Sequence, residues 1–524
     1  MENNAKSLFS LVVAALVLGV AGDILFQDAA LGINAVAGLT LLVAAIALLQ
    51  RRMEVRVPGR YRWLALPTIL AAGGFALRDS PTLAALSGIV LAACLLLGAH
   101  GSHAPQYSEP GILASLRAMM GAGRGILGGS VRFVRHDVPR VMHPGPAQKS
   151  QHGRAAGRGV LLTIPLLLVF GSLLSAADPV FAHYLAALFQ WDLAAFWEHC
   201  GWIVVGFCLV GGFLRFLLQT QTDEEQREEA APRVSIGRVE TAIVLGALDT
   251  LFFLFVLVQF RYFFGGRETV LVTVGMTYAA YARHGFFELV TVAGLTLPLL
   301  LTLHAWQERP APSPDTGQTP AQETLFRGLA GLLLLLLFVI MASALARMNL
   351  YRSEYGLTEL RVYTTAFMGW LAVVFVWLGL TVLRGRRQHF AGGAGVWAFA
   401  ALALLLVWNP DMRIVRANAA LSQSGRHFDA DYATSLSADA VPELIADLAR
   451  LSPADRQAVA TRLLQRRPAA RAADWRSWCW GRWATERCLA RSHARLVALS
   501  GPAPQVPARP QTRTVTMIVP AVPR

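Results

Sequence analysis

Apolar runs of about twenty residues, separated by short polar or arginine-rich stretches, recur along most of this chain. About 20 apolar residues in a helix cross the roughly 30 Å hydrocarbon layer of a bilayer, so each run predicts a membrane-spanning helix. The third run is interrupted by Pro67 and by Gly73-Gly74, and the last is short. Eleven spans are predicted: 8–26, 30–49, 63–78, 82–99, 159–177, 200–218, 239–260, 285–306, 325–346, 362–383 and 394–408.

The composition supports a membrane protein. The 524 residues are 55% hydrophobic and only 15% charged, with a mean hydropathy of +0.46, whereas soluble proteins carry about 25% charged residues. The predicted fold class is all-α: a polytopic transmembrane helical bundle with a small C-terminal helical extramembrane domain. The net charge of +14 does not indicate a nucleic-acid partner, because the arginines lie mostly in loops beside the spans.

The arginines predict an orientation. They are dense in 51–62 and 100–158 and in every second loop thereafter, and much sparser in the alternate loops. By the positive-inside rule the dense loops are cytoplasmic, which places the N-terminus inside and the region after Trp408 outside. We interpret Leu8 to Gly22 as an uncleaved first span rather than a signal peptide, since no convincing small-residue cleavage site follows. The expected location is the inner (plasma) membrane of a bacterium.

The spans and loops predict five regions. Residues 1–99 hold four transmembrane helices, and 100–158 form a basic cytoplasmic loop. Residues 159–408 form a core of seven spans, with a Pro-rich linker at 307–323. A helical extracytoplasmic domain at 409–500 and a disordered Pro-rich tail at 501–524 follow.

The basic loop contains a candidate interfacial helix between 111 and 135. Arg117, Arg124 and Arg135 would share one helical face, which favours contact with anionic lipid. Five glycines in the same stretch oppose a stable helix. A flexible basic loop is therefore the alternative.

The C-terminal region carries a helix-start signal at Ser452-Pro453-Ala454-Asp455, and a second helix is expected from Asp439 to Leu451. Outside the cytoplasm, Cys479 and Cys488 could form a disulfide, although sequence separation does not fix the required geometry. We expect this region to be the place where a protein partner binds.

Three polar groups are predicted to converge at the outer ends of spans seven to ten. Charged side chains near apolar spans are costly and often functional, so these residues are candidates for lining an outward-facing ligand cavity. The alternative is a purely structural role, in which these residues anchor the helices at the membrane interface or form a salt bridge. The candidates are Gln259, Arg261 and Tyr262; Tyr278, Tyr281, Arg283, His284 and Glu288; and Tyr351, Arg352, Glu354, Tyr355 and Arg361.

Asp249 lies in the middle of span seven and is the candidate for proton or ion coupling, with Arg215 as a possible partner. A helix–helix hydrogen bond is the structural alternative. His183, His199 and Cys200 match no metal-ligand spacing, so neither a metal nor another cofactor is predicted. No nucleophile elbow, phosphate-binding loop, His-Glu-x-x-His or kinase motif is present, so the sequence gives no warrant for an enzyme.

Several motifs resemble those of a bacterial family of polytopic membrane proteins that carry a domain of unknown function. They are Gln259-Phe-Arg-Tyr-Phe-Phe-Gly-Gly266, Tyr278-Ala-Ala-Tyr-Ala-Arg-His-Gly-Phe-Phe-Glu-Leu289, Tyr351-Arg-Ser-Glu-Tyr-Gly-Leu-Thr358, Asn409-Pro410, Asp429-Ala-Asp-Tyr432 and Leu436-Ser-Ala-Asp-Ala-Val441. The likeness extends over roughly residues 160–490. Ala280 stands where the resemblance implies an acid, which puts any carboxylate role there in doubt. The resemblance implies an inner-membrane protein and no established activity.

Three functions follow as hypotheses. The first is a transporter or ligand sensor that uses the outward-facing Arg/Tyr/Glu cavity. The second is a non-catalytic assembly or regulatory subunit that binds a partner through its C-terminal domain. The third is a membrane-embedded enzyme.

Overall fold

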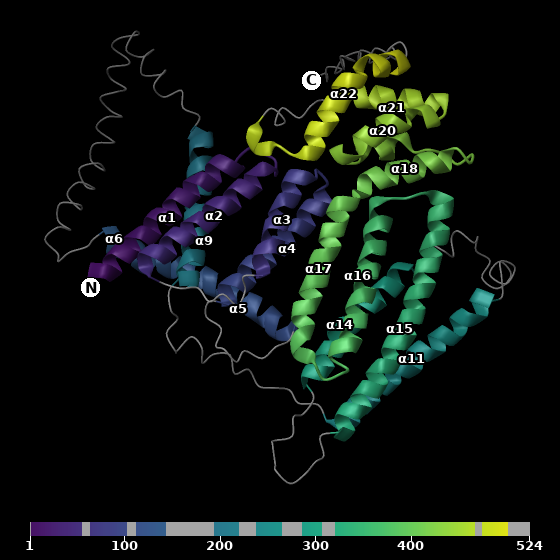
Figure 1. Cartoon of the computed structure of the whole chain (residues 1–524), viewed down its shortest axis with the longest axis horizontal. Coiled ribbons are helices and arrows are strands. Elements are labelled where there is room, and N and C mark those ends of the chain that lie inside the picture. The colour runs from purple at the N-terminus through teal and green to yellow at the C-terminus, as the bar shows by residue number, and fades with distance from the viewer. Residues whose placement is uncertain are drawn as a thin grey trace, which may run out of the picture.

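The computed structural model describes residues 2–54, 63–101, 112–142, 193–218, 237–264, 286–306, 320–466 and 474–500. Throughout these ranges the regular elements are helices, with no strand (Figure 1). The predicted all-α class is confirmed for this part of the chain.

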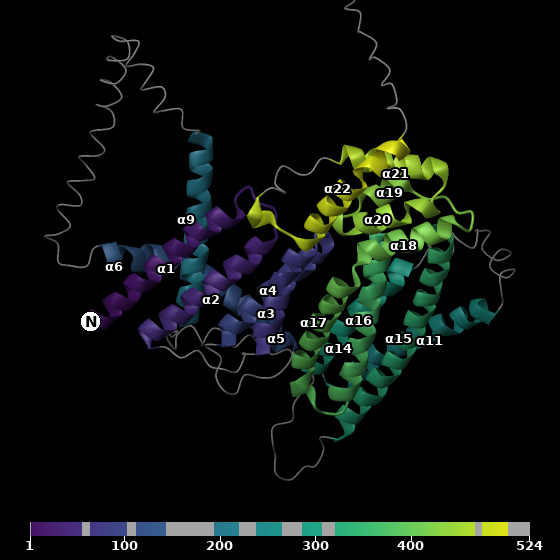
Figure 2. The same cartoon turned by 45° about the horizontal axis from the view of Figure 1, so that its top comes forward.

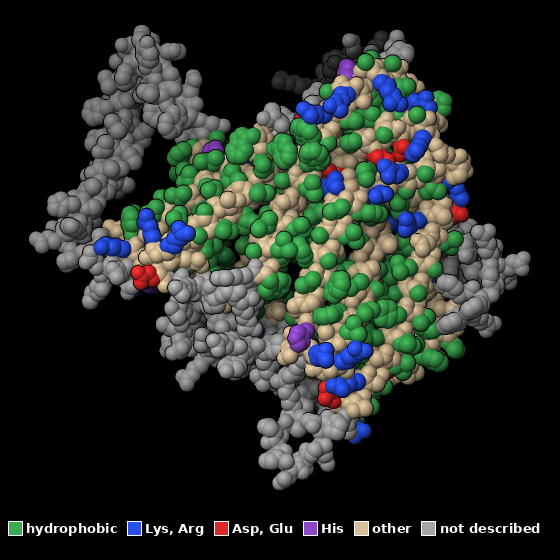
Figure 3. Space-filling model, viewed as in Figure 1, with side chains coloured by type: hydrophobic (Ala, Val, Ile, Leu, Met, Phe, Trp, Pro, Cys, Tyr) green, Lys and Arg blue, Asp and Glu red, His purple; other side chains and the backbone are tan. Residues whose placement is uncertain are grey.

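Nine helices in the described ranges are long and apolar enough to cross a membrane. This makes the chain a multi-pass membrane protein. In a space-filling view, hydrophobic side chains cover the middle of the visible face and Lys and Arg gather toward its ends (Figure 3). The helices are α1 (Glu2–Phe26), α2 (Ile33–Met53), α4 (Pro81–Gly101), α9 (Leu193–Leu218), α11 (Arg238–Phe264), α14 (Phe286–Trp306), α15 (Pro320–Tyr355), α16 (Glu359–Thr381) and α17 (Phe390–Trp408).

The other two of the eleven expected spans have different outcomes. The third is α3 (Ala65–Leu77), which has 13 residues and is shorter than a full span. The fifth, at 159–177, lies outside the described residues. The ninth continues to Tyr355, so the expected outer loop at 351–361 is instead the end of α15, a short turn and the start of α16.

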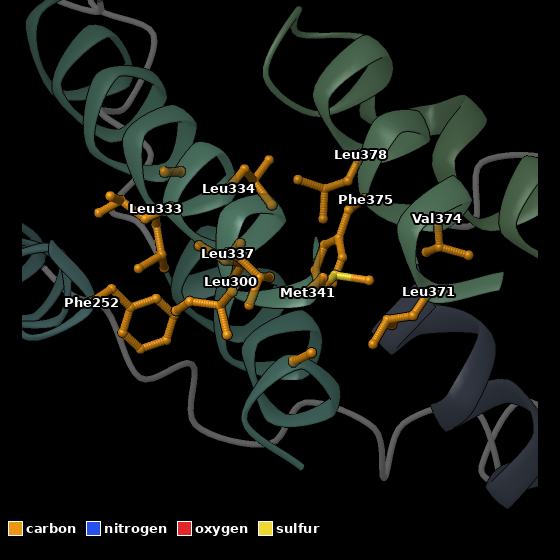
Figure 4. Packing of buried hydrophobic residues seen from close by; sticks show 14 of the residues in the cluster. Phe252, Leu300, Leu333, Leu334, Leu337, Met341, Leu371, Val374, Phe375 and Leu378 are labelled. Carbon is orange, nitrogen blue, oxygen red and sulfur yellow. The ribbon is translucent and has the colours of Figure 1, made fainter. Parts of the chain in front are cut away.

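The helices form two groups. One contains α1 to α5 and α9, and the other contains α11 and α14 to α17, with α17 packed against α3 and α4. In the second group, leucines of α15 meet Phe375 and Leu378 of α16, and Leu300 of α14 lies beside them (Figure 4). Without a solvent-driven hydrophobic effect inside a bilayer, close packing of this kind stabilises helix contacts.

Small residues let α1 and α9 approach closely. A Cβ placed on Gly19 would lie 2.9 Å from the Phe207 backbone nitrogen, and one on Gly206 would lie 3.2 Å from the Gly19 Cα. At the same pair of helices Asp23 of α1 contacts the His199 ring, with 2.9 Å between Oδ2 and Nδ1. Backbone contact of this kind is typical of small-xxx-small helix packing in membranes.

The predicted helix in the basic loop is present as α5 (Ile112–Arg132). A π-helical turn (Phe133–Asp137) and α6 (Val138–Met142) continue it. Arg215 forms an ion pair with Asp137 of the π turn. The suggested Arg215–Asp249 pairing is therefore wrong, because this arginine is held by a carboxylate of α5's extension.

Residues 409–466 and 474–500 form a layer of short helices over one end of both groups, here called the C-terminal cap (Figures 1 and 2). It has its own core of buried side chains, among them Ile414, Leu444 and Val459. We call the opposite end of the bundle the far end. The cap contains α18 (Pro410–Ser422), α19 (Ala430–Ser435), α20 (Val441–Asp447), α21 (Pro453–Gln465) and α22 (Trp480–Ser500), with single 3-10 turns at 438–440, 448–450 and 475–477.

The sequence signal at Ser452 is confirmed. α21 begins at Pro453, and the Ser452 Oγ accepts a hydrogen bond from the Asp455 backbone N–H at 3.2 Å. The helix expected over Asp439 to Leu451 is present as α20 between two 3-10 turns.

The α1/α9 crossing gives a prediction. Gly19→Ala should lower the stability of the protein by about 1–3 kcal/mol, since the added methyl meets backbone that cannot move aside. Gly22→Ala on the same helix is the control, because no atom lies within 4 Å of its Cβ position. The measurement is the melting temperature of the purified protein in detergent. Equal melting temperatures for the two variants would contradict this packing.

Candidate functional site

Gln259 is the one member of the first candidate group whose side-chain contacts are described. It is 8% exposed, and its Oε1 accepts hydrogen bonds from Ser343 Oγ at 3.1 Å and from Arg347 at 2.8 Å. It therefore joins α11 to α15 instead of facing a cavity. Arg261 and Tyr262 lie in the last turns of α11, and their side chains are outside the described part.

The second candidate group is described only at Glu288. Tyr278, Tyr281, Arg283 and His284 lie outside the described residues. Glu288 lies in the first turn of α14 with an exposed side chain. The predicted helical face shared by these residues therefore stays a prediction.

The third candidate group surrounds the turn between α15 and α16. The Arg361 guanidinium lies 4.1 Å from the Tyr351 ring centroid and donates to the Tyr355 and Gly356 carbonyls at 3.2 and 2.6 Å. These bonds occupy carbonyls at the α15 C-terminus, which its own helix cannot satisfy. Gly356 has φ +72°, a conformation that suits glycine. Arg361 of α16 therefore caps the C-terminal end of α15 by satisfying its free carbonyl groups.

The same turn is attached to the cap. Glu354 pairs with Arg426 of the cap at 2.6 Å. The Leu357 N–H and C=O bond to the Asn418 side chain of α18 at 2.7 and 2.9 Å. Tyr355 is exposed, and Arg352 makes a long contact of 3.5 Å with Asn349. The third group thus contributes to docking the cap.

Asp249 is buried in α11, with 5% of its surface exposed. Among the described residues, neither of its carboxylate oxygens has a hydrogen-bond partner. The role of Asp249 in proton or ion coupling stays a prediction.

A set of buried and half-buried charged and polar side chains lies where the cap meets the turn between α3 and α4. We call it the junction cluster, and its members come from positions far apart in the chain. It consists of Arg78, Asp79, Asp411, Ser437, Asp439 and Arg482.

Asp439 is at the centre of the junction cluster. Its side chain is 1% exposed and lies 3.6 Å from the Arg78 guanidinium. Its Oδ2 accepts the Asp79 backbone N–H at 2.7 Å, and the Asp79 carboxylate accepts the Ala438 N–H at 3.3 Å. This reciprocal pair joins the α3–α4 turn to the cap through two backbone donors.

Arg482 holds the other side of Asp79. It forms an ion pair with the Asp79 carboxylate and donates to the Leu31 carbonyl at 2.7 Å and the Ser477 carbonyl at 2.6 Å. A Cβ on the neighbouring Gly481 would lie 2.2 Å from an Asp439 oxygen. α22 can therefore approach the cluster this closely only with glycine at 481.

Asp411 is fully buried beside Asp439. Ser437 Oγ donates a hydrogen bond to one of its oxygens, and the other has no partner within the described ranges. Burial raises the pKa of Asp411 above its ordinary value, against the opposing effect of the Ser437 hydrogen bonds. Burial likewise raises the pKa of Asp439, to about 6. Burial therefore shifts both of these neighbouring carboxyls toward the neutral form relative to a carboxyl in water.

The sequence contained partial signals for this cluster. Asn409-Pro410 and Leu436 to Val441 are among the motifs that carry the family resemblance. Asp79 and Arg482 give no such signal, since an acid and an arginine in polar segments are ordinary until the fold brings them together.

Two further predictions concern the cysteines of the cap and metal binding in the chain. Cys479 and Cys488 are both free thiols. Cys479 directly precedes α22 and Cys488 lies within it nine residues later, about 13 Å along a helix and beyond disulfide reach. The possible disulfide between them is thus not formed. Across the described ranges no group of His, Cys, Asp or Glu has a metal-binding arrangement.

The fold and this cluster define an α-helical multi-pass membrane protein with a docked polar cap. The chain belongs to the family whose model is described as "Domain of unknown function (DUF4153)", which matches residues 65–446. The matched range begins earlier and ends earlier than the expected likeness over roughly 160–490. No curated protein and no solved structure gives a significant match.

Arg482→Gln should weaken cap docking, because Asp79 loses its ion-pair partner in a partly buried position. We expect a loss of about 1–3 kcal/mol, measured by thermal unfolding and by faster protease cleavage in the cap. Arg491→Gln is the matched control, an exposed arginine on the same helix. If both variants behave like wild type, Arg482 does not hold the cap.

Asp439 predicts a pH dependence. A folded-state pKa of about 6, raised from 3.8, means that the folded state binds more protons between these values. The contribution of this group to stability is therefore full below pH 4 and is lost as the pH rises to about 6.

Asp439→Asn should remove this loss, so the difference in melting temperature between variant and wild type should change from pH 4 to pH 6 in the variant's favour. Asp431→Asn is the control, since the Asp431 side chain is 79% exposed. A constant difference across that range would show that Asp439 does not titrate there.

Proposed function

We propose that the protein is a non-catalytic membrane scaffold, an assembly or regulatory subunit that holds the C-terminal cap in one orientation for a partner protein. The observation that carries the proposal is that three interhelical turns, belonging to both helix groups, are bonded to the cap. A cap tied at one point could swing about it, whereas three separate attachments fix its orientation.

The first attachment is the junction cluster at the α3–α4 turn. The second lies at the α1–α2 turn, where the Ile33 N–H donates to the Trp478 carbonyl at 2.9 Å and the Ala30 N–H to Ser477 Oγ at 2.9 Å. A Cβ on Gly32 would lie 2.4 Å from the Trp478 carbonyl oxygen. This turn therefore touches the cap backbone directly.

The third attachment is the α15–α16 turn, through Asn418 and the Glu354–Arg426 pair. Nearby, the Glu359 N–H donates to the Tyr432 hydroxyl at 2.7 Å. Burial raises the pKa of Tyr432 to about 12, so its hydroxyl keeps its proton. Polar groups of the cap thus satisfy backbone groups at helix ends in both halves of the bundle.

The proposal includes a location and an orientation. The arginine distribution supports a cytoplasmic N-terminus and an extracytoplasmic cap, and the proposed membrane is the bacterial inner membrane. Arg51, Arg117, Arg238 and Arg384 belong to the far end of the bundle, in agreement with that distribution.

Transport is the second candidate function, and one observation favours it. Asp249 is buried in a span without a hydrogen-bond partner among the described residues, and intramembrane carboxylates often serve proton or ion coupling. The predicted outward cavity receives less support, because Gln259, Arg361 and Glu354 are engaged in helix and cap contacts.

Complementation separates the two functions. In a strain that lacks the gene and shows a growth defect, the scaffold proposal predicts that Asp249→Asn and Glu288→Gln restore growth. It also predicts that Arg482→Gln restores less growth than its control Arg491→Gln. The measurement is growth at equal membrane levels of each variant, which immunoblotting verifies.

The opposite pattern would reject the scaffold. If Asp249→Asn or Glu288→Gln abolishes complementation while removal of 409–524 leaves it intact, the activity belongs to the membrane helices. Chemical cross-linking from the exposed face of the cap to one defined partner, lost on disrupting the junction cluster, is the direct physical test of the scaffold.

A further inference from the structure

Helix α5 has three distinct sides. Its buried side packs on α9, where a Cβ on Gly125 would lie 2.3 Å from the Phe216 ring and one on Gly129 would lie 3.1 Å from the Gly212 carbonyl oxygen. Ala122 and Phe133 complete this side and are fully buried. Two of the five glycines that oppose a helix in the sequence, Gly125 and Gly129, are therefore the residues that let α5 pack closely against α9.

The second side of α5 is apolar and exposed. Its residues recur at spacings of four, seven, four and three positions, which keeps them in one stripe along a helix. They are Leu116, Met120, Leu127, Val131 and Val134, each between 42% and 64% exposed.

The third side carries Arg117 and Arg124, and Arg135 of the π turn continues it; all three are exposed. Arg117 and Arg135 each directly follow a residue of the apolar stripe, and Arg124 lies four positions after Met120, so the arginine row lies beside the stripe. Among the described residues these three arginines form no ion pair with an acidic side chain. Cationic and apolar stripes side by side are typical of a helix at a membrane surface.

The position of α5 in the fold agrees with this character. α5 contacts α4, α9, α14 and α17, and thus bridges the two helix groups. Its core neighbours are Leu49, Ala99 and Leu214 to Leu218. These residues lie at the ends of α2, α4 and α9 that are opposite to the cap. α5 is therefore at the far end of the bundle, where the spans leave the hydrocarbon layer.

We propose that α5 is an interfacial helix whose arginine row binds the phosphate groups of anionic phospholipids while its exposed leucine, methionine and valine side chains enter the acyl layer. The long arginine side chains can extend along apolar surface with the guanidinium in the headgroup region. The proposal does not depend on the scaffold function, since it concerns the opposite end of the bundle.

The test uses the full-length protein reconstituted in nanodiscs that contain equal amounts of phosphatidylcholine and phosphatidylglycerol. After detergent extraction, native mass spectrometry counts the two lipids retained on the protein. Each arginine near an anionic surface contributes about fivefold in binding. The Arg117→Gln/Arg124→Gln/Arg135→Gln variant should therefore lose most of the preference for phosphatidylglycerol over phosphatidylcholine.

The matched control is Arg487→Gln/Arg491→Gln/Arg495→Gln, which removes the same charge from an exposed row on α22 of the cap. This control should keep the wild-type preference. Equal losses in both variants, or no loss in the α5 variant, would overturn the proposal.

A salt titration of the wild-type protein keeps the proposal falsifiable if the α5 variant does not fold. Headgroup binding by an exposed arginine row must weaken as ionic strength rises, because salt screens exposed charges. A phosphatidylglycerol preference that does not change between low and high salt would reject the arginine row as its source.

Discussion

Among the three attachments of the cap, the α3–α4 turn is under the strictest electrostatic constraint, the burial of Asp439 between two helical layers. A buried carboxylate is tolerated only with donors around it, and here the donors come from elsewhere in the chain: the Asp79 N–H and the Arg78 guanidinium of the α3–α4 turn. These two donors reach Asp439 because the cap lies against the α3–α4 turn. Arg482 then neutralises Asp79, so the charges of turn and cap form one connected set.

This constraint extends into the backbone. Asn409 joins α17 to α18 with φ +53°, where its side chain accepts the Met412 N–H and donates to the Asp439 carbonyl. Gly481 brings α22 against the Asp439 carboxyl. The sharp exit from the last span and the close approach of the final helix thus both serve the same buried group. A substitution at Asn409 or Gly481 would therefore alter the contacts of Asp439 with the α3–α4 turn.

The features that could be predicted from the sequence are the helices and helix starts, because residues close together in the chain determine them. Within the described ranges, nine of the apolar runs correspond to helices long enough for full spans, and the helix-start signal at Ser452 located the start of α21. The junction cluster could not be predicted in that way. Asp79 meets Asp439 across 360 positions and Arg482 across 403, and no local pattern encodes such a pairing. The glycines of α5 oppose a helix by propensity, yet α5 is helical, and two of them, Gly125 and Gly129, lie in contact with α9.

Arginine illustrates why charge near a span does not by itself identify a functional cavity. Arg361 closes the C-terminus of α15, Arg347 bonds to Gln259 between two spans, and Arg426 pairs with Glu354. Arg361 and Arg347 satisfy part-buried acceptors, which is a structural requirement whatever the function, and the exposed Arg426–Glu354 pair joins α15 to the cap. The arginine row of α5 differs, because its apolar neighbours are exposed as well. Charged groups that already bond to acceptors of the protein are poorly placed to bind a ligand. The better candidates are charged groups without such partners among the described residues, such as the arginine row of α5.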